Sequence, residues 1–428
     1  MGVTFNKEIG PGIRLFGVKQ DSLKSNRITV SVLVPLKKET ASLYAIIPQI
    51  LQSCGSEYPN YTALKRKLAE LYGASLYGYS SKWGDMQALT ISVKAIDNRF
   101  APGGEDVLQS CGKLILSLFL RPLLDENGNF TEETLAERKR LACEKIISQI
   151  NNKRLFALRD AMAKMCPGDG YGVDPSGTVE GINALTGEDI ANGWRTLLKT
   201  GDITVSAVGS GNFTSFLESA GEQLLKLERD FTPAENPAIY APEAFGEYTV
   251  RMPVTQAKLV LGFKTGTNLQ TGGYTACELF SYLFGRTPHS LLFTNVREKL
   301  SLCYYCVSHY AQVKGVMLVD SGLEEKNAKQ AEEEILSQLE RIKQGDFSDE
   351  EFASAVQSLV NERLSSCDSG DALEGYYYPL LRGGLPLKTP QESAEEIRKY
   401  TRQDVINIAS DITLSYRYLL AGEVKDNG

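Results

Sequence analysis

One stretch of the chain combines a cation and a phenol at a spacing that could serve catalysis. In SLLFTNVREKLSLCYYCVSHY, residues 290–310, Arg297 is followed seven residues later by Tyr304. Apolar residues from Leu291 to Val296 recur at helical spacing, and the residues after Lys299 have the aromatic and small apolar content of a strand. An arginine fork can hold a carbonyl oxygen, and a phenol can donate to developing negative charge.

The same two residues also have a purely structural interpretation. Charged residues at the end of a helix are usually solvated, and cations there are favoured by the helix dipole. Tyrosines in strands usually pack half-buried against neighbouring side chains. The spacing alone therefore leaves both interpretations open, and the rest of the chain has to separate them.

Histidine is scarce, which excludes several kinds of catalytic site. The chain has two histidines, His289 and His309, both in its second half. The zinc motifs HExxH and HxxEH need two histidines on one helix, so neither motif is present. No G-x-S-x-G nucleophile elbow occurs. We expect both histidines to lie in turns or on the surface.

The eight cysteines do not form a recognisable metal site. They are scattered, and most stand in apolar runs, as small buried hydrophobes do. Cys303 and Cys306 form a CxxC pair, but residues three apart on a strand should face opposite sides of the sheet. No second CxxC or histidine pair completes a zinc site.

Composition narrows the class of protein. A length of 428 residues favours two or three domains, and a net charge of −7 argues against a nucleic-acid partner. The N-terminus has no apolar h-region, and no apolar run approaches the roughly 18 residues of a membrane span. The sequence therefore predicts a cytoplasmic protein without a membrane segment.

The first half is predicted to mix strands and helices. Strands are predicted at 12–18, 27–35, 75–81, 86–93 and 203–211. Helices are predicted at 41–53, 61–72, 107–119 and 130–150. Thr186, with Asp189 three residues on, predicts the N-cap of a further helix. The Pro- and Ala-rich stretch 231–246 has no periodicity and is interpreted as a linker.

The second half repeats the first at an offset of about 215 to 225 residues. LVLGFKT at 259–265 corresponds to RITVSVLVP at 27–35, and FSDEEFASAVQSLVNER corresponds to FTEETLAERKRLACEKI. Ser348 and Glu351 give this later helix a capping box. We therefore expect a tandem α+β duplication, with domains 1–230 and 247–428 on either side of the linker, each a sheet with helices packed on one face.

These features resemble the pitrilysin/insulinase (M16) family of zinc peptidases over about residues 10–425. The likeness rests on the duplication and on the second-half pattern S-x-L-F-x-x-x-R-E-K-x-x-L-x-Y. HSLLFTNVREKLSLCYY, YAIIPQILQSCGSEYP and CEKIISQINNKR are most similar to bacterial non-catalytic members associated with elongation factor P modification. The resemblance implies two metallohydrolase domains of the mitochondrial-processing-peptidase type, arranged as a clamshell.

The resemblance also implies that the zinc site is degenerate. Active members carry HxxEH on the first helix, and a downstream glutamate completes a site where zinc activates water. Ile46, Gln49 and Ile50 occupy the corresponding positions, and none of them can bind zinc or take a proton at neutral pH. Glu137 lies near the third-ligand position and is interpreted as a solvated helix residue. No cofactor and no cleavage by this chain alone are expected.

In the family, the arginine and tyrosine of the second-half motif hold the substrate peptide and stabilise the oxyanion across a chamber from the zinc. Arg297 and Tyr304 match these positions, whereas Leu291 stands where the family commonly has arginine. Divided heterodimers exist in which one subunit brings Zn²⁺ and the other brings this pair. The resemblance therefore implies an Arg/Tyr subunit whose partner is an HxxEH homologue and whose substrate is a peptide.

A second function remains open from the sequence. The fold could have survived as a catalytically dead scaffold or binding protein, as in the family's core subunits of respiratory complexes. The intact Arg297…Tyr304 spacing favours the accessory subunit, whereas the missing histidines alone favour the scaffold.

Overall fold

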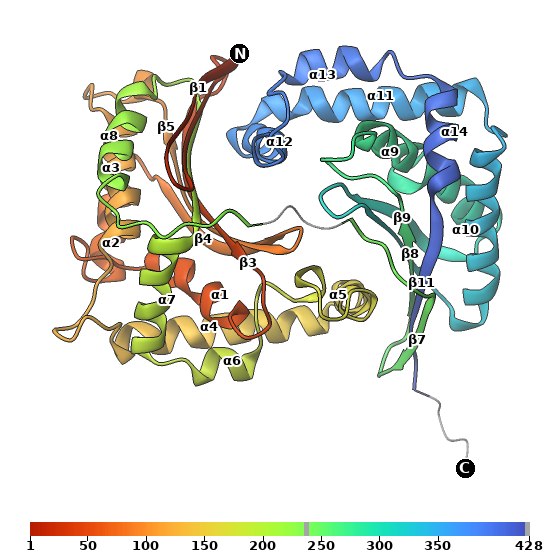
Figure 1. Ribbon diagram of the computed structural model, residues 1–428, viewed down its shortest axis with the longest axis horizontal. Helices are drawn as coiled ribbons and strands as arrows, with labels where there is room; N and C mark the ends of the chain where they lie inside the picture. Colours follow the sequence, from red (N-terminus) through yellow and green to blue (C-terminus); the bar gives the residue numbers. More distant parts are fainter. Residues whose placement is uncertain (235–238, 424–428) are drawn as a thin grey trace. The chain divides into compact units, whose positions relative to one another are not determined.

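The computed structural model describes residues 1–234 and 239–423, which form two compact units (Figure 1). The first unit comprises Met1–Ser148, Val173–Asn236 and Cys367–Gly375, and the second comprises Gln149–Gly172, Pro237–Ser366 and Tyr376–Gly428. Each unit therefore contains a segment from the other half of the sequence. Residues 235–238 of the predicted linker and residues 424–428 lie outside the described part.

The first unit is built on a six-stranded sheet with the strand order β1-β2-β6-β3-β5-β4. Its strands are β1 (Gly2–Gly10), β2 (Ile13–Lys19), β3 (Ser25–Pro35), β4 (Ser75–Trp83), β5 (Met86–Ile96) and β6 (Asp202–Gly209). Its helices are α1 (Ala41–Leu51), α2 (Tyr61–Glu70), α3 (Val107–Leu120), α4 (Glu132–Asn151), α6 (Val179–Ala184), α7 (Gly187–Thr200) and α8 (Thr214–Leu224), with a 3₁₀ turn at Asn98–Phe100. Alternate strand residues such as Ile28, Val30 and Val32 pack against the helices in one core.

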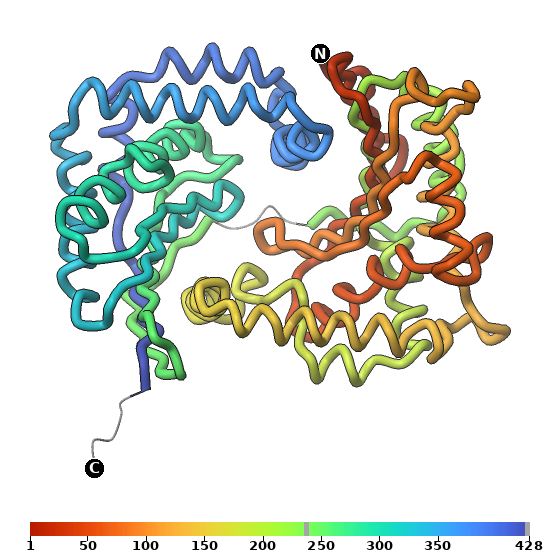
Figure 2. Tube along the Cα trace, turned by 180° about the vertical axis from the view of Figure 1, so that it is seen from behind, coloured from red at the N-terminus to blue at the C-terminus, as the bar shows by residue number. Residues whose placement is uncertain are grey.

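The second unit has a five-stranded sheet with the order β7-β11-β8-β10-β9 (Figures 1 and 2). Its strands are β7 (Gly246–Arg251), β8 (Ala257–Lys264), β9 (Cys303–Ala311), β10 (Val316–Leu323) and β11 (Thr413–Ala421). Its helices are α9 (Tyr274–Ser281), α10 (Ala328–Lys343), α11 (Asp349–Ser365), α13 (Pro390–Ile397) and α14 (Arg402–Asp411). Two π-helices, η3 (Tyr282–Arg286) and η4 (Phe293–Lys299), and 3₁₀ turns at Glu325–Asn327 and Ser366–Asp368 complete it.

Helix α5 (Lys153–Met165) covers the other face of the second unit's sheet, and helix α12 (Gly370–Arg382) contributes its first residues to the first unit. Helix α5, followed by a 3₁₀ turn at Gly170–Gly172, packs Ala157 and Ala161 against Leu318 and Tyr418 of the second unit's sheet. Neighbouring residues on β10 therefore enter different cores, since Met317 and Val319 face the other helices of the unit.

The predicted α+β class is confirmed by two sheets with helices packed against them. The capping boxes Thr186/Asp189 and Ser348/Glu351 are both present. Strand β1 was not predicted, because GVTFNKEIG is polar and largely exposed at the edge of the sheet and lacks regular alternation. No helix in the described part of the chain is both long and apolar enough to cross a membrane.

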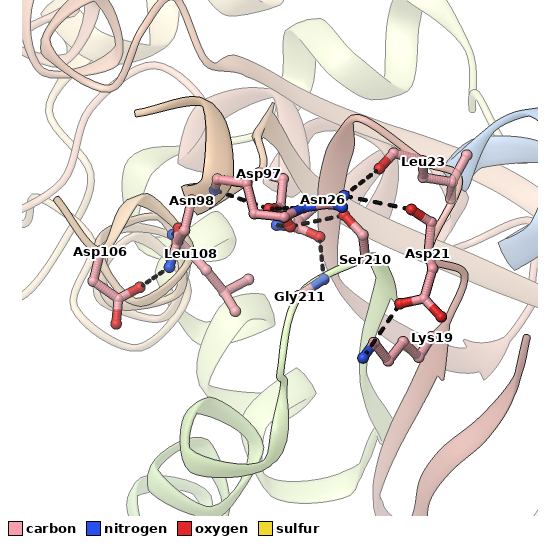
Figure 3. Close-up of polar contacts among 11 residues, drawn as sticks. Lys19, Asp21, Leu23, Asn26, Asp97, Asn98, Asp106, Leu108, Ser210 and Gly211 are labelled. Carbon is pink, nitrogen blue, oxygen red and sulfur yellow. Dashed lines mark hydrogen bonds and ion pairs between the residues drawn. The ribbon is translucent and has the colours of Figure 1, made fainter. Parts of the chain in front are cut away.

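One end of the first sheet is held by a buried carboxylate, Asp97 (Figure 3). Its Oδ1 accepts hydrogen bonds from the backbone N–H of Arg99 at 3.0 Å and from the Arg99 guanidinium at 2.8 Å. Its Oδ2 accepts from Asn26 Nδ2 at 3.0 Å and from Ser210 Oγ at 2.7 Å. The four bonds join β3, the end of β5 and the end of β6.

This network makes the first unit sensitive to acid. Burial alone would raise the pKa of Asp97, but the four hydrogen bonds outweigh it and lower the pKa to about 2. Because the folded-state pKa lies below the unfolded value, the carboxylate contributes about 2 kcal/mol that is present above pH 4 and is lost as the pH falls towards 2. We expect the stability difference between the natural chain and Asp97→Asn, measured in urea, to shrink over that range. A constant difference would contradict this assignment.

Candidate functional site

The first-half positions that the M16 resemblance assigns to a zinc site are closed. Ile46 and Ile50 on α1 are 0% exposed and belong to the hydrophobic core. Gln49 donates its side-chain N–H to the carbonyl of Ala45 at 3.3 Å, so its amide is turned back onto its own helix. Two buried aliphatic side chains and an internally bonded amide do not fit a zinc ion.

Helix α1 is held against the edge strand β4 by a close approach. A Cβ at Gly78 would lie 2.0 Å from the carbonyl oxygen of Pro48, so only glycine fits there. The backbone N–H of Gly78 donates to Gln52 Oε1 at 2.7 Å. Pro48 lies in the interior of α1.

Glu137 is solvated, as its sequence context indicated. Its side chain is 59% exposed and pairs with Arg138 at 3.1 Å. Across residues 1–234 and 239–423, no three His, Cys, Asp or Glu side chains lie together in a way that could hold a metal ion.

Arg297 lies in the π-helix η4. The backbone N–H of Leu300 bonds to the carbonyl of Asn295 at 3.1 Å, which is the wide spacing of a π-turn. Asn295 is buried and supports the turn by donating to Gln338 Oε1 at 2.9 Å. The Arg297 guanidinium lies 4.4 Å from the centre of the Phe293 ring, and its side chain is 39% exposed.

Tyr304 lies at a β-bulge on the edge strand β9. Leu323 of β10 pairs with Cys303 and Gly322 pairs with Tyr305, so Tyr304 is an extra residue between two pairs. A bulge re-aims a side chain, and Tyr304 is 60% exposed. The phenol is therefore presented to the outside of the chain.

The turn between these two residues is specific. Ser301 has φ = 51°, a left-handed conformation that is uncommon for residues other than glycine. The N–H of Leu302 then returns to the carbonyl of Val296 at 3.1 Å, and Leu302 is buried. The helix end and the strand start are thus fixed relative to each other.

The structure places Arg297 and Tyr304 in one unit, both partly open to solvent, but it does not join them directly. No hydrogen bond, ion pair or ring contact connects the two side chains within the described residues. Their nearby charges are Glu298, 3.6 Å from Arg297, and Lys326, whose pKa is raised chiefly by Glu324 and to a smaller extent by Tyr304. Both donors are available to a group from outside.

The expectation that Cys303 and Cys306 face opposite sides of the sheet is wrong. Both are buried in the same core, because the bulge at Tyr304 inserts one residue and shifts the alternation. The hydrogen bond with Cys303 and burial raise the pKa of the Cys306 thiol. Both side chains are buried in the hydrophobic core, which agrees with the interpretation of these cysteines as core residues.

A second polar cluster in the same unit was not predicted. Asp320 on β10 is 1% exposed and accepts from Arg154 Nε at 2.5 Å, Arg154 Nη2 at 3.1 Å and His309 Nε2 at 2.9 Å. Arg286 donates to His309 Nδ1 at 3.0 Å. His309 is therefore part of a network rather than a simple surface residue. Its members come from α5, η3, β9 and β10, so no sequence motif contains them.

Comparisons with known proteins agree with this geometry. Residues 184–359 match the model of the Peptidase M16 inactive domain. The "Probable inactive metalloprotease YmfF" of Bacillus subtilis is 27% identical over 413 residues, which is 96% of each chain. A conserved protein from Enterococcus faecalis has the same fold, with a TM-score of 0.90, 24% identity and full coverage of both chains. The peptidase M16 inactive domain from Pseudomonas fluorescens matches over 100% of both chains with a TM-score of 0.80 and 14% identity.

Residues 184–359 therefore match the inactive domain of M16 peptidases, and the whole chain has the fold of solved M16-like structures. The likeness to a relative described as a probable inactive metalloprotease agrees with a non-catalytic role.

Proposed function

We propose that this chain is the non-catalytic subunit of a heterodimeric M16 zinc endopeptidase. It supplies Arg297 and Tyr304 to a partner that carries HxxEH and Zn²⁺, and the substrate is a peptide undergoing maturation or processing. The complex is cytoplasmic in this proposal.

The observation that carries the proposal is the contrast between the two halves. Ile46 and Ile50, which the resemblance assigns to zinc ligand positions, are core residues at 0% exposure, whereas Tyr304 is held out of the core at 60% exposure. A bulge, a π-helix and a left-handed serine all lie between Phe293 and Tyr305. Such features cost stability and tend to persist where they position functional groups.

The chemistry of the pair suits the role of a second subunit. The planar guanidinium of Arg297 can donate two hydrogen bonds to a peptide carbonyl, and its position over Phe293 limits its motion. The Tyr304 phenol can donate to the oxyanion that forms during hydrolysis. Zinc in the partner would polarise the scissile carbonyl and activate water.

One relative supports a peptide substrate. The "Antilisterial bacteriocin subtilosin biosynthesis protein AlbE" of Bacillus subtilis is 26% identical over 176 residues, 41% of this chain and 44% of AlbE. Its description concerns production of a bacteriocin. The alternative function is a scaffold without any catalytic contribution. It is supported only by the absence of zinc ligands at Ile46, Gln49 and Ile50.

The proposal is tested by mixing this chain with an HxxEH homologue from the same organism. We expect native mass spectrometry to show a one-to-one complex and a library of quenched fluorescent peptides to be cleaved only by the mixture. The matched control is the mixture made with a homologue whose HxxEH glutamate is replaced by glutamine. A stable complex that cleaves nothing, or a homologue equally active alone, would favour the scaffold.

A further inference from the structure

One strip of the second unit's sheet is left open by helix α5. On the face that α5 covers, its apolar residues contact β8, β10 and β11 through Val260, Leu318 and Tyr418. Tyr305, Val307 and His309 of β9 lie on the same face, since they pair with Gly322, Asp320 and Leu318. All three are only partly buried. The strip starts next to Tyr304.

Cations are concentrated around this strip. Arg154 lies 4.2 Å from the centre of the Tyr305 ring, and Lys258 Nζ lies 5.7 Å from it. The Tyr305 ring has room beside the two cations because residue 322 of β10 is glycine. A Cβ at Gly322 would lie 2.3 Å from Tyr305 Cε1. Arg286 lies at the other end of the strip, on His309.

The charges of this cluster do not balance. Arg154, Lys258 and Arg286 contribute three positive charges, and Asp320 is the one carboxylate bonded to the cluster among the described residues. Glu278, which the charge on Arg286 also reaches, is paired with Arg363. Burial, and after it the charge on Arg154, lower the pKa of Lys258, as expected where positive charge is in excess. In a chain of net charge −7, this local excess runs against the overall sign.

Donors at the edge of the cluster remain accessible. Arg286 is exposed, and among the described residues its Nη1 bonds to His309 Nδ1 while its other donors have no hydrogen-bond partner. The Arg154 side chain is 40% exposed and uses Nε and Nη2 on Asp320. The Tyr305 hydroxyl is buried and has no hydrogen-bond partner within the described residues. A carboxylate that approached the strip would meet arginine donors already fixed in place.

We propose that this strip recognises a carboxylate of the peptide that Tyr304 contacts. The inference rests on the proposed function, which places the peptide at Tyr304. It names the substrate class as an extended peptide with a carboxylate at a fixed distance from the scissile bond. Tyr304 and His309 are five residues apart on β9, about 16 Å at about 3.3 Å per residue. In an extended peptide, the carboxylate should therefore lie about five residues along the peptide from the residue that contacts Tyr304.

Binding to the full chain without its partner tests the site directly. A neutral peptide blocked at both ends would be scanned with one aspartate at each position, and its affinity measured by fluorescence anisotropy. We expect one position to bind about tenfold more tightly than the parent peptide, and the gain to fall as salt is raised. Arg286→Gln should remove the gain and Arg286→Lys should restore part of it. Arg251→Gln, an exposed arginine on β7 paired with Glu325, is the matched control and should change nothing.

A second peptide series separates the two sources of a carboxylate. Peptides of decreasing length with a free C-terminus would reveal a terminal carboxylate, whereas the blocked aspartate series reveals a side chain. A gain in either series that depends on Arg286 supports the site and identifies its ligand. No gain in either series, or a gain that Arg286→Gln leaves intact, overturns it.

The outcome is independent of the outcome for the heterodimer. A carboxylate gain on the isolated chain, together with no cleavage by any mixture, would leave the site standing and remove the proposed function. Cleavage by the mixture without any preference for acidic peptides would support the proposed function and remove the carboxylate site.

Discussion

Arg297→Ala should lower kcat/KM of the reconstituted peptidase by about 100-fold while leaving the complex assembled. Removal of one preorganised donor to a carbonyl that develops negative charge typically costs this much, even where Tyr304 and the partner's zinc would still act on that carbonyl. Arg297 is on the surface and makes one weak ion pair, with Glu298 at 3.6 Å, so its loss should not unfold the chain. Cleavage rates and native mass spectra on the same samples measure both parts of the prediction.

Two further variants sharpen this result. Tyr304→Phe removes a single hydroxyl from an exposed side chain and should lower kcat more than it raises KM, since the bond forms chiefly in the transition state. Arg398→Ala removes an exposed arginine paired with Glu395 on α13 and should leave both constants unchanged. Full activity of the Arg297→Ala complex would exclude a catalytic role for the pair.

Arg27→Ala should destabilise the first unit by about 3 to 5 kcal/mol, the usual cost of stranding a buried charge. Arg27 is 6% exposed and bonds Glu374 Oε2 at 2.6 Å and Asp371 Oδ1 at 2.5 Å. Glu374, whose side chain is 14% exposed, also accepts from Thr29 at 3.0 Å and from Ser206. Urea unfolding monitored in the first unit would measure the loss.

The double variant Arg27→Met with Glu374→Gln separates the stranded charge from lost packing. It should recover most of the stability, because no buried carboxylate is left without a cation. Arg14→Ala on β2 of the same sheet is the control, since its pair with Glu8 at 3.2 Å is exposed and worth under about 1 kcal/mol. A loss below 1 kcal/mol for Arg27→Ala would show that Glu374 is solvated.

Local sequence rules predicted what depends on local structure. The alternation in RITVSVLVP gave strand β3, and Thr186 and Ser348 gave helix starts that the structure confirms as capping boxes. The similarity of the two halves gave the fold class. These features depend on residues a few positions apart, which periodicity and capping rules cover.

The details of the site could not be predicted in this way. The bulge at Tyr304 depends on the pairing of β9 with β10, and it reversed the expected facing of Cys306. Helix α5 was not predicted, and its place on the second sheet follows from a salt bridge 166 residues apart, Arg154 to Asp320. Such contacts form only when distant segments meet, so no spacing in the sequence signals them.

Metal analysis of the purified chains, alone and as a complex, tests whether the partner supplies the zinc and this chain lacks it. We expect no zinc bound to this chain, one zinc per heterodimer, and cleavage that requires both subunits and is lost when the zinc is chelated. Zinc bound stoichiometrically to this chain alone, or peptide hydrolysis by it in the absence of a partner, would rule out this division of roles.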